Sequence, residues 1–248
     1  MPQPEFIYPD WPATGQVHAC VSTRRTGFSV PPYDSFNLAA HVGDDADAVG
    51  RNRALLREFL QLVQEPVWLN QVHGDRVLDL DGPVRDLDAD AAVTSRQHAV
   101  CSVMTADCLP LLFASTSGDR VGAAHAGWRG LAAGIIEATV AEMHTPAEQL
   151  LVWLGPAIGP QHFEVGEDVR QAFMQQQPRA EAAFIATRPG HWLADIYQLA
   201  RLRLARLGIH QIYGGDLCSY TDAQRFYSYR RDKRTGRMAS LIWLGDNT

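Results

Sequence analysis

The strongest constraint on the fold is a set of apolar, β-like runs that break or end at short polar stretches. The runs span residues 67–80, 99–114 and 120–124, and each breaks or ends at a histidine or cysteine near glycine or proline. The three stretches are Asn70-Gln71-Val72-His73-Gly74, Ala106-Asp107-Cys108-Leu109-Pro110 and His125-Ala126-Gly127-Trp128-Arg129-Gly130. Active-site loops tend to occupy such places. We therefore expect His73, Cys108 and His125 to be brought together by folding.

Other segments predict further strands and a few helices. Strands are expected over 17–22, 150–154 and 238–244, and helical spacing of apolar residues is found over 47–63, 131–143 and 193–207. Gly208 is a natural residue to follow the last helix. Residues 127–130 are expected to form a turn whose N–H groups can hold an anion. Pro110 is expected at an edge or an interruption, not in a central regular strand.

Mixed strands and helices without regular βαβ alternation predict an α+β fold. A chain of 248 residues with 46% hydrophobic and 20% charged residues can bury a sizeable core, as one domain or as two small ones. We interpret residues 1–248 as a single domain.

Charge and composition exclude several classes of protein. The net charge of −6 gives no support for nucleic-acid binding. The one basic cluster, 230–234 with Arg237, is interpreted as a solvated loop, although an anion-binding role stays open. The N-terminal run 1–5 has no signal-peptide pattern, and no apolar stretch approaches the ~18 residues of a membrane span. Four cysteines indicate reduced thiols in the cytoplasm. No protein partner is inferred.

Two imidazoles and a thiolate fit two kinds of chemistry. They suit a small zinc or copper site, and a zinc ion with three protein ligands and an open position is typical of catalysis. They also suit an activated cysteine nucleophile. The break at Asp107-Cys108 could alternatively be a buried β-bulge. His41 is a candidate for a supporting role, while Cys20, Cys101 and Cys218 are expected to pack as small hydrophobic residues.

Dinucleotide, Walker, nucleophile-elbow and zincin motifs are not found in the sequence. Dehydrogenases, P-loop enzymes, α/β-hydrolases and zincins therefore lose support.

The chain resembles the YfiH-like family, also called the laccase-domain or polyphenol oxidoreductase family, purine nucleoside phosphorylase and peptidoglycan editing factor. The matching motifs are the three stretches above together with residues 22–24, 32–38, 41–44, 52–53, 154–159, 218–221 and 226–231. The resemblance implies two packed mixed β-sheets flanked by helices, in four layers (α/β/β/α).

The resemblance also implies an enzyme that acts on small molecules: it would cleave adenosine and inosine with phosphate, with adenosine deamination as a second activity. His73, Cys108 and His125 would be the catalytic residues and the ligands of zinc, with copper able to bind in vitro. Candidates for holding the substrates are Asn37, Arg53, Arg129 and Arg230.

Three rival interpretations stay open. Cys108 could be the nucleophile of a thiol hydrolase or amidase that edits peptidoglycan precursors. A copper-dependent polyphenol oxidase is a second alternative; the chain has no His-x-His pair for a multicopper cluster, but one copper at the triad is possible, with Met104 as a weak axial ligand. A non-catalytic binding module would require the site to be vestigial.

Overall fold

The computed structural model describes residues 3–246, in which the strands form two large sheets and a small one. The predicted domain 1–248 and the N-terminal run 1–5 reach beyond the described residues. The five-stranded sheet has the order β1 (Phe6–Ile7), β2 (Val17–Ser22), β14 (Met238–Leu244), β6 (Val100–Thr105) and β3 (Val67–Trp68). The six-stranded sheet has the order β13 (Gln211–Gly214), β9 (Leu150–Leu154), β7 (Leu109–Ser115), β8 (Val121–Ala126), β5 (Ala91–Thr94) and β4 (Val77–Asp79). Both sheets are mixed, with β3–β6, β13–β9 and β4–β5 parallel and the other pairs antiparallel.

The two large sheets pack face to face, and this packing explains the continuous apolar runs. In β7, Leu112 and Ala114 belong to the core between the sheets, whereas Leu111 and Phe113 belong to the core on the other face. Alternate side chains of a strand point to opposite faces, so a strand buried on both faces must be apolar at every position.

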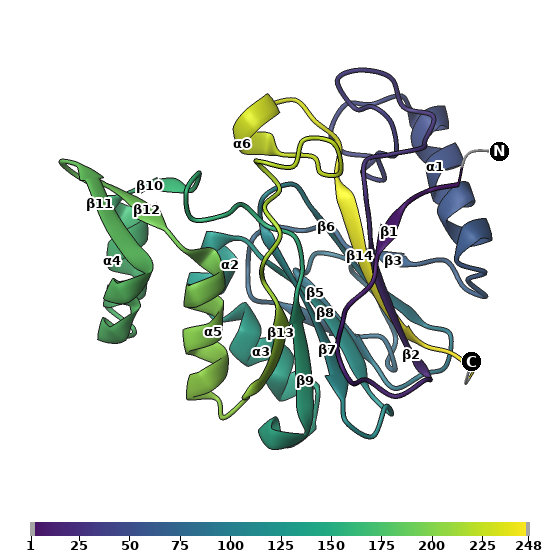
Figure 1. Cartoon of the computed structure of the whole chain (residues 1–248). Coiled ribbons are helices and arrows are strands. Elements are labelled where there is room, and N and C mark those ends of the chain that lie inside the picture. Colours follow the sequence, from purple (N-terminus) through teal and green to yellow (C-terminus); the bar gives the residue numbers. More distant parts are fainter. Residues whose placement is uncertain (1–2, 247–248) are drawn as a thin grey trace.

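Helices cover the outer faces of both sheets (Figure 1). Helix α1 (Ala46–Phe59) begins with Asp45, whose side chain accepts a hydrogen bond from Ala48 N, and it packs Leu56 on the five-stranded sheet. The six-stranded sheet is covered by α2 (Trp128–Ala133), α3 (Ile135–Glu142) and α5 (Ile196–Arg206). The predicted α+β architecture of two packed mixed sheets with helices outside is therefore observed.

A third sheet was not predicted. It consists of β10 (Glu164–Gly166), β12 (His191–Ala194) and β11 (Phe184–Arg188), and α4 (Glu167–Met174) packs beside it (Figure 1). The remaining elements are two 3₁₀ turns, Ala147–Gln149 and Pro178–Ala183, and the short helix α6 (Tyr229–Asp232).

Some predicted elements need correction. The expected turn 127–130 is shorter, because α2 already begins at Trp128, and the helix expected over 131–143 is interrupted at Gly134, where φ is +112°. Residues 193–194 belong to β12, and α5 begins after Asp195, whose carboxylate accepts from Gln198 N. The expectation for Pro110 was wrong: it lies in β7, which is central in its sheet. Gly155 N still donates to the Pro110 carbonyl at 2.9 Å, and the Gly155 carbonyl, which a proline without an N–H cannot serve, accepts from the Tyr197 hydroxyl at 3.1 Å.

The breaks in the apolar runs are crossings between the two large sheets. Residues 106–108 carry the chain from β6 in one sheet to β7 in the other. The segment between β3 and β4, which includes His73, makes a second such crossing. The break at Asp107-Cys108 is therefore a crossing and not a bulge within one strand.

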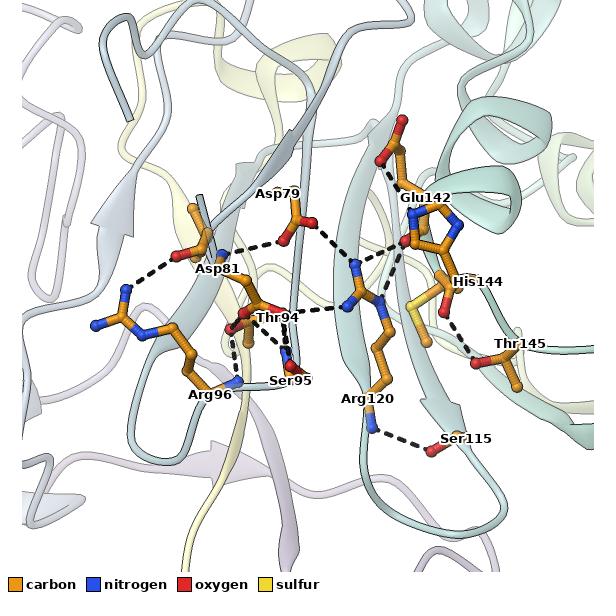
Figure 2. Close-up of polar contacts among 12 residues, drawn as sticks. Asp79, Asp81, Thr94, Ser95, Arg96, Ser115, Arg120, Glu142, His144 and Thr145 are labelled. Atoms are coloured by element: carbon orange, nitrogen blue, oxygen red, sulfur yellow. Dashed lines mark hydrogen bonds and ion pairs between the residues drawn. The ribbon is translucent and has the colours of Figure 1, made fainter. Parts of the chain in front are cut away.

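At the other end of β8, Arg120 ties several elements together (Figure 2). Its guanidinium donates to Asp79 Oδ2 and Asp81 Oδ2, each at 3.2 Å, and to the Glu142 carbonyl at 2.9 Å. Asp81 also accepts from the hydroxyl groups of Thr94 and Ser95. These bonds join the end of β4 and the end of β5 to the C-terminus of α3.

Within the described residues, no helix combines the length and the apolar character that crossing a membrane requires.

Candidate metal centre and adjoining cavities

The structure brings His73, Cys108 and His125 together, with their ligand atoms all within 4.8 Å of one another. Cys108 immediately precedes β7, and His125 is the second-last residue of β8, where it pairs with Pro110. Because β7 and β8 are antiparallel, the start of one strand lies beside the end of the other. The triad therefore forms from residues 35 and 17 positions apart in the sequence.

A buried carboxylate that the sequence analysis missed, Asp90, holds the His73 loop in place. Its oxygens accept from the backbone N–H groups of Val72 (3.2 Å), His73 (3.0 Å) and Gly74 (2.7 Å). His73 itself has a φ of +61°, a left-handed conformation that ordinary residues rarely adopt. The carboxylate stabilises this turn and so directs the His73 ring toward His125, with ring centroids 4.8 Å apart.

Asp90 also orients His125. The His125 Nδ1 lies 2.8 Å from Asp90 Oδ1, and the two side chains are 3% and 0% exposed. A carboxylate on Nδ1 fixes the ring and leaves Nε2 as the free nitrogen, which is the usual support of a metal-binding histidine. Burial alone would raise the pKa of Asp90, but the hydrogen bonds from His125 and from the backbone of Gly74 and His73 lower it.

The thiol and the buried imidazole stabilise each other's charged forms. Burial alone would raise the pKa of Cys108, but the positive charge of His125 and hydrogen bonds with both histidines outweigh it and lower the pKa. Burial alone would lower the pKa of His125, but the Cys108 thiolate and the Asp90 carboxylate raise it. The lowered pKa favours the thiolate of Cys108, the form that binds metals and attacks electrophiles.

Gly127 leaves the space that this cluster needs. A Cβ atom at this position would lie 3.0 Å from Cys108 Sγ, 3.0 Å from His73 Cδ2 and 3.7 Å from His125 Cε1. Any other residue would press a side chain between the three donors. The nearby Gly130 has a similar role in packing, because a Cβ there would lie 2.7 Å from the Gly74 carbonyl oxygen.

Two cavities meet at the triad. The first, the Arg237 cavity, has a volume of about 260 Å³ and is lined by His41, Gln71, His73, Met104, Thr105, Ala106, Cys108, His125, Tyr229 and Arg237. The second, the Trp128 cavity, has a volume of about 280 Å³ and is lined by His73, Ala106, Asp107, Cys108, Trp128, Arg129, Ile158, Phe163, Ile196, Tyr229 and Arg230. Both volumes are close to the lower end of the range for ligand sites, roughly 300–1,000 Å³.

The four predicted substrate residues lie in different places. Arg129 and Arg230 line the Trp128 cavity, whereas Asn37 and Arg53 line neither cavity. Asn37 is fully buried, and its amide binds Ala39, the Asp44 carboxylate and the Arg237 backbone N–H. Arg53 lies over the Trp68 ring and donates to the Leu38 carbonyl.

The basic cluster is only in part the solvated loop that was predicted: residues 232–234 are exposed, but Arg230, Arg231 and Arg237 are half-buried. Arg231 donates to the carbonyl groups of residues 219, 220 and 226, and Arg230 donates to those of residues 162 and 164. Arg237 borders the site, and no sequence signal had separated it from its neighbours. Of the three cysteines expected to pack as hydrophobic residues, Cys20 and Cys101 are buried, but Cys218 is only half-buried.

The donors fit a single zinc or copper ion. A thiolate and two imidazoles are ligands that both metals accept, and three protein ligands leave a tetrahedral ion one open position. Within residues 3–246, this triad is the one group of three metal-binding side chains close enough to share an ion. A multicopper cluster is therefore not supported by the described residues.

Comparison with known proteins identifies the family. A family profile described as multi-copper polyphenol oxidoreductase laccase matches residues 18–245. The protein named purine nucleoside phosphorylase YfiH of Escherichia coli is 56% identical over 241 residues, covering 97% of this chain and 99% of its own length. A purine nucleoside phosphorylase of Pseudomonas aeruginosa is 54% identical over 242 residues, with the same coverage of both chains. A crystal structure of a Neisseria meningitidis protein has a TM-score of 0.92 and 46% identity, and covers 97% of this chain and 99% of that one. The profile and the relatives, each matching almost the whole chain, show that it belongs to the YfiH-like family of multi-copper polyphenol oxidoreductase laccases.

Proposed function

We propose that this chain is a metal-dependent purine nucleoside phosphorylase that acts on inosine and adenosine. The observation that carries the proposal is a three-donor metal site at the junction of two cavities. A nucleoside phosphorylase must hold two substrates, a nucleoside and phosphate, on opposite sides of one carbon atom. The names of the relatives support the same reaction.

The reaction joins a phosphate oxygen to C1′ of the ribose and breaks the C1′–N9 bond. The electron pair of that bond leaves with the purine, which takes up one proton, and the other product is ribose 1-phosphate. His73, Cys108 and His125 would hold the metal, with zinc as the proposed ion. When bound, the ion would supply positive charge and Lewis acidity at the junction of the cavities.

The residues of the Trp128 cavity suit a purine base. Trp128, Phe163 and Ile158 provide apolar surface, and aromatic side chains stack well on flat ligands. Arg129 and Arg230 supply polar groups at the same cavity. The proposed role of Asn37 and Arg53 is to position the residues around the cavities, since their polar atoms already form hydrogen bonds within the protein.

Adenosine deamination is the second proposed activity. It uses water in place of phosphate, and the three-donor set, which leaves a bound ion one open position, favours it. Removing phosphate from the assay should therefore leave deamination intact while it stops base release.

Two rival chemistries use the same triad. The lowered pKa of Cys108 also suits a thiol nucleophile, as in an amidase that edits peptidoglycan precursors, and a copper ion at the triad would suit a polyphenol oxidase. All four cysteines are unpaired, which fits the cytoplasmic setting included in this proposal.

The test is product analysis of inosine cleavage by the zinc-loaded protein, with and without phosphate. We expect hypoxanthine and ribose 1-phosphate only when phosphate is present, and reversible loss of activity with a chelator. Cys108→Ser should lose both the metal and the activity, whereas Cys218→Ser, which changes a half-buried cysteine outside both cavities, should keep both. Equal base release without phosphate would show hydrolysis, and full activity of metal-free protein would favour the thiol mechanism.

A further inference from the structure

Arg237 is a cation fixed at the wall of the site. It immediately precedes β14, and its backbone N–H donates to Asn37 Oδ1 at 2.9 Å. Its side chain turns back so that Nη1 donates to the carbonyl groups of Thr235 and Gly236 at 2.9 and 3.0 Å. The backbone of the neighbouring Gly236 is closely packed, because a Cβ atom at this position would lie 2.7 Å from the Tyr227 ring and 2.8 Å from Asn37 Cβ. The guanidinium is therefore held in one place before any substrate arrives.

Arg237 has no ion pair with a carboxylate among residues 3–246, although its side chain is half-buried. The negative groups that act on it are the Cys108 thiolate, which is one of the proposed metal ligands, and the Asp107 carboxylate. The acidic group close by, Asp107, already accepts from the Ser219 hydroxyl and from the Arg230 backbone N–H. A half-buried cation that has no ion pair with a carboxylate is stabilised when an anion binds it.

The other arginines considered for the site do not line this cavity. Arg53 borders neither cavity, and Arg230 borders only the Trp128 cavity. Arg129 is exposed and lies over the Trp128 ring, in the cavity assigned to the purine. Arg237 is thus the arginine that lines the opposite cavity.

A second, independent observation points to a ligand in the Arg237 cavity. Thr105 borders this cavity with 1% exposure, and its hydroxyl has no hydrogen-bond partner among the described residues. The hydroxyl of Thr235, two residues before Arg237, is also buried without a partner among the described residues, although Thr235 does not line the cavity. Buried hydroxyl groups are nearly always paired, so an orphan at a cavity wall indicates a missing acceptor.

We propose that the Arg237 cavity is the phosphate subsite, with Arg237 as the anion clamp and the Thr105 hydroxyl as a further donor. This assignment rests on the proposed phosphorolysis. Phosphate oxygens match a guanidinium fork, which binds them through two parallel hydrogen bonds. His73 and Cys108 border both cavities, so phosphate here and a purine in the Trp128 cavity would meet at the triad.

The test measures binding of inorganic phosphate to the zinc-loaded protein by calorimetry, without a nucleoside. Arg237→Met should weaken phosphate binding about 10- to 100-fold, the range expected for a charge-assisted hydrogen-bond clamp. In steady-state assays the KM for phosphate should rise by the same factor, and the KM for inosine should change by less than about 3-fold. Arg201→Met is the matched control, because Arg201 is also half-buried and donates to a backbone carbonyl, that of Gly214, but borders neither cavity.

Thr105→Val provides a variant of nearly unchanged shape. If the hydroxyl serves phosphate, this variant should bind phosphate about 3- to 10-fold more weakly. If the hydroxyl is only an unpaired buried group, the variant should bind phosphate normally and unfold at a higher temperature, which would overturn the role of Thr105.

Failure of the subsite can be told apart from failure of the proposed function. If inosine is cleaved with phosphate but Arg237→Met keeps the wild-type phosphate affinity, the subsite is wrong and the function stands. If no nucleoside is cleaved but phosphate binding depends on Arg237, the subsite stands without the function. Wild-type protein that binds no phosphate overturns the subsite.

Discussion

The Asp90 carboxylate is the group whose replacement best tests how this site is built. It accepts from His125 Nδ1 at 2.8 Å and from the backbone N–H groups of His73 and Gly74 at 3.0 and 2.7 Å, with a longer bond from Val72 N. Asp90→Asn keeps the shape but replaces one acceptor oxygen by an NH₂ group. Whichever way the amide turns, a donor then faces either His125 and His73 or Gly74 and Val72.

The size of the effect follows from these contacts. A buried N–H left without an acceptor costs about 1–3 kcal/mol, and a hydrogen bond to a charged group contributes about 1.5–3 kcal/mol. We therefore expect Asp90→Asn to destabilise the metal-free protein by about 2–4 kcal/mol. Because the substitution also frees the orientation of His125, zinc affinity should fall about 10- to 100-fold.

Urea unfolding of the metal-free protein and competition with a chromophoric chelator measure the two quantities. Asp88→Asn is the control, since Asp88 is exposed and only two residues away. The folded-state pKa of Asp90 is lowered, so its stabilising contribution is present above the unfolded pKa of about 3.9 and is lost as the pH falls through the folded value. The difference in stability between wild type and Asp90→Asn should therefore shrink in acid. Zinc affinity within 2-fold of wild type would refute the reasoning.

Three further predictions concern the triad and the fold. Gly127→Ala places a Cβ atom 3.0 Å from Cys108 Sγ and His73 Cδ2, so metal analysis should show loss of zinc, whereas Gly50→Ala, with no atom within 4 Å, should keep it. Arg120→Met removes the side-chain contacts of Arg120 that Figure 2 shows, and it should destabilise the protein by about 1–3 kcal/mol in urea without loss of metal. The control Arg188→Met breaks an exposed pair with Glu164 and should change stability by less than about 1 kcal/mol. Because the pKa of Cys108 is lowered, iodoacetamide should alkylate it in metal-free protein below the pH at which ordinary thiols react, and zinc should block the reaction. Peptide mapping separates this thiol from Cys218, and a Cys108 profile like that of a free thiol would contradict the prediction.

The sequence alone determined several of the buried strands. The predicted bounds 17–22, 150–154 and 238–244 match β2, β9 and β14, because buried strands are mostly apolar. The strand β5 (Ala91–Thr94), buried at all four positions, was not predicted. The same reasoning failed for β11 (Phe184–Arg188), four of whose five residues are exposed. A short, exposed strand has no apolar pattern that distinguishes it from a loop.

The sequence also singled out the three donors, because each lies where an apolar run breaks or ends beside glycine or proline. The sequence did not identify the groups that orient those donors or line the cavity beside them. Asp90 lies 35 residues from His125, and its importance depends on the backbone N–H groups that the His73 loop presents to it. Arg237 is one arginine among several in its segment, and its backbone is fixed by Asn37, 200 residues away. A carboxylate or guanidinium acquires its role from burial and from partners, and only the packing of the two sheets decides which partners those are.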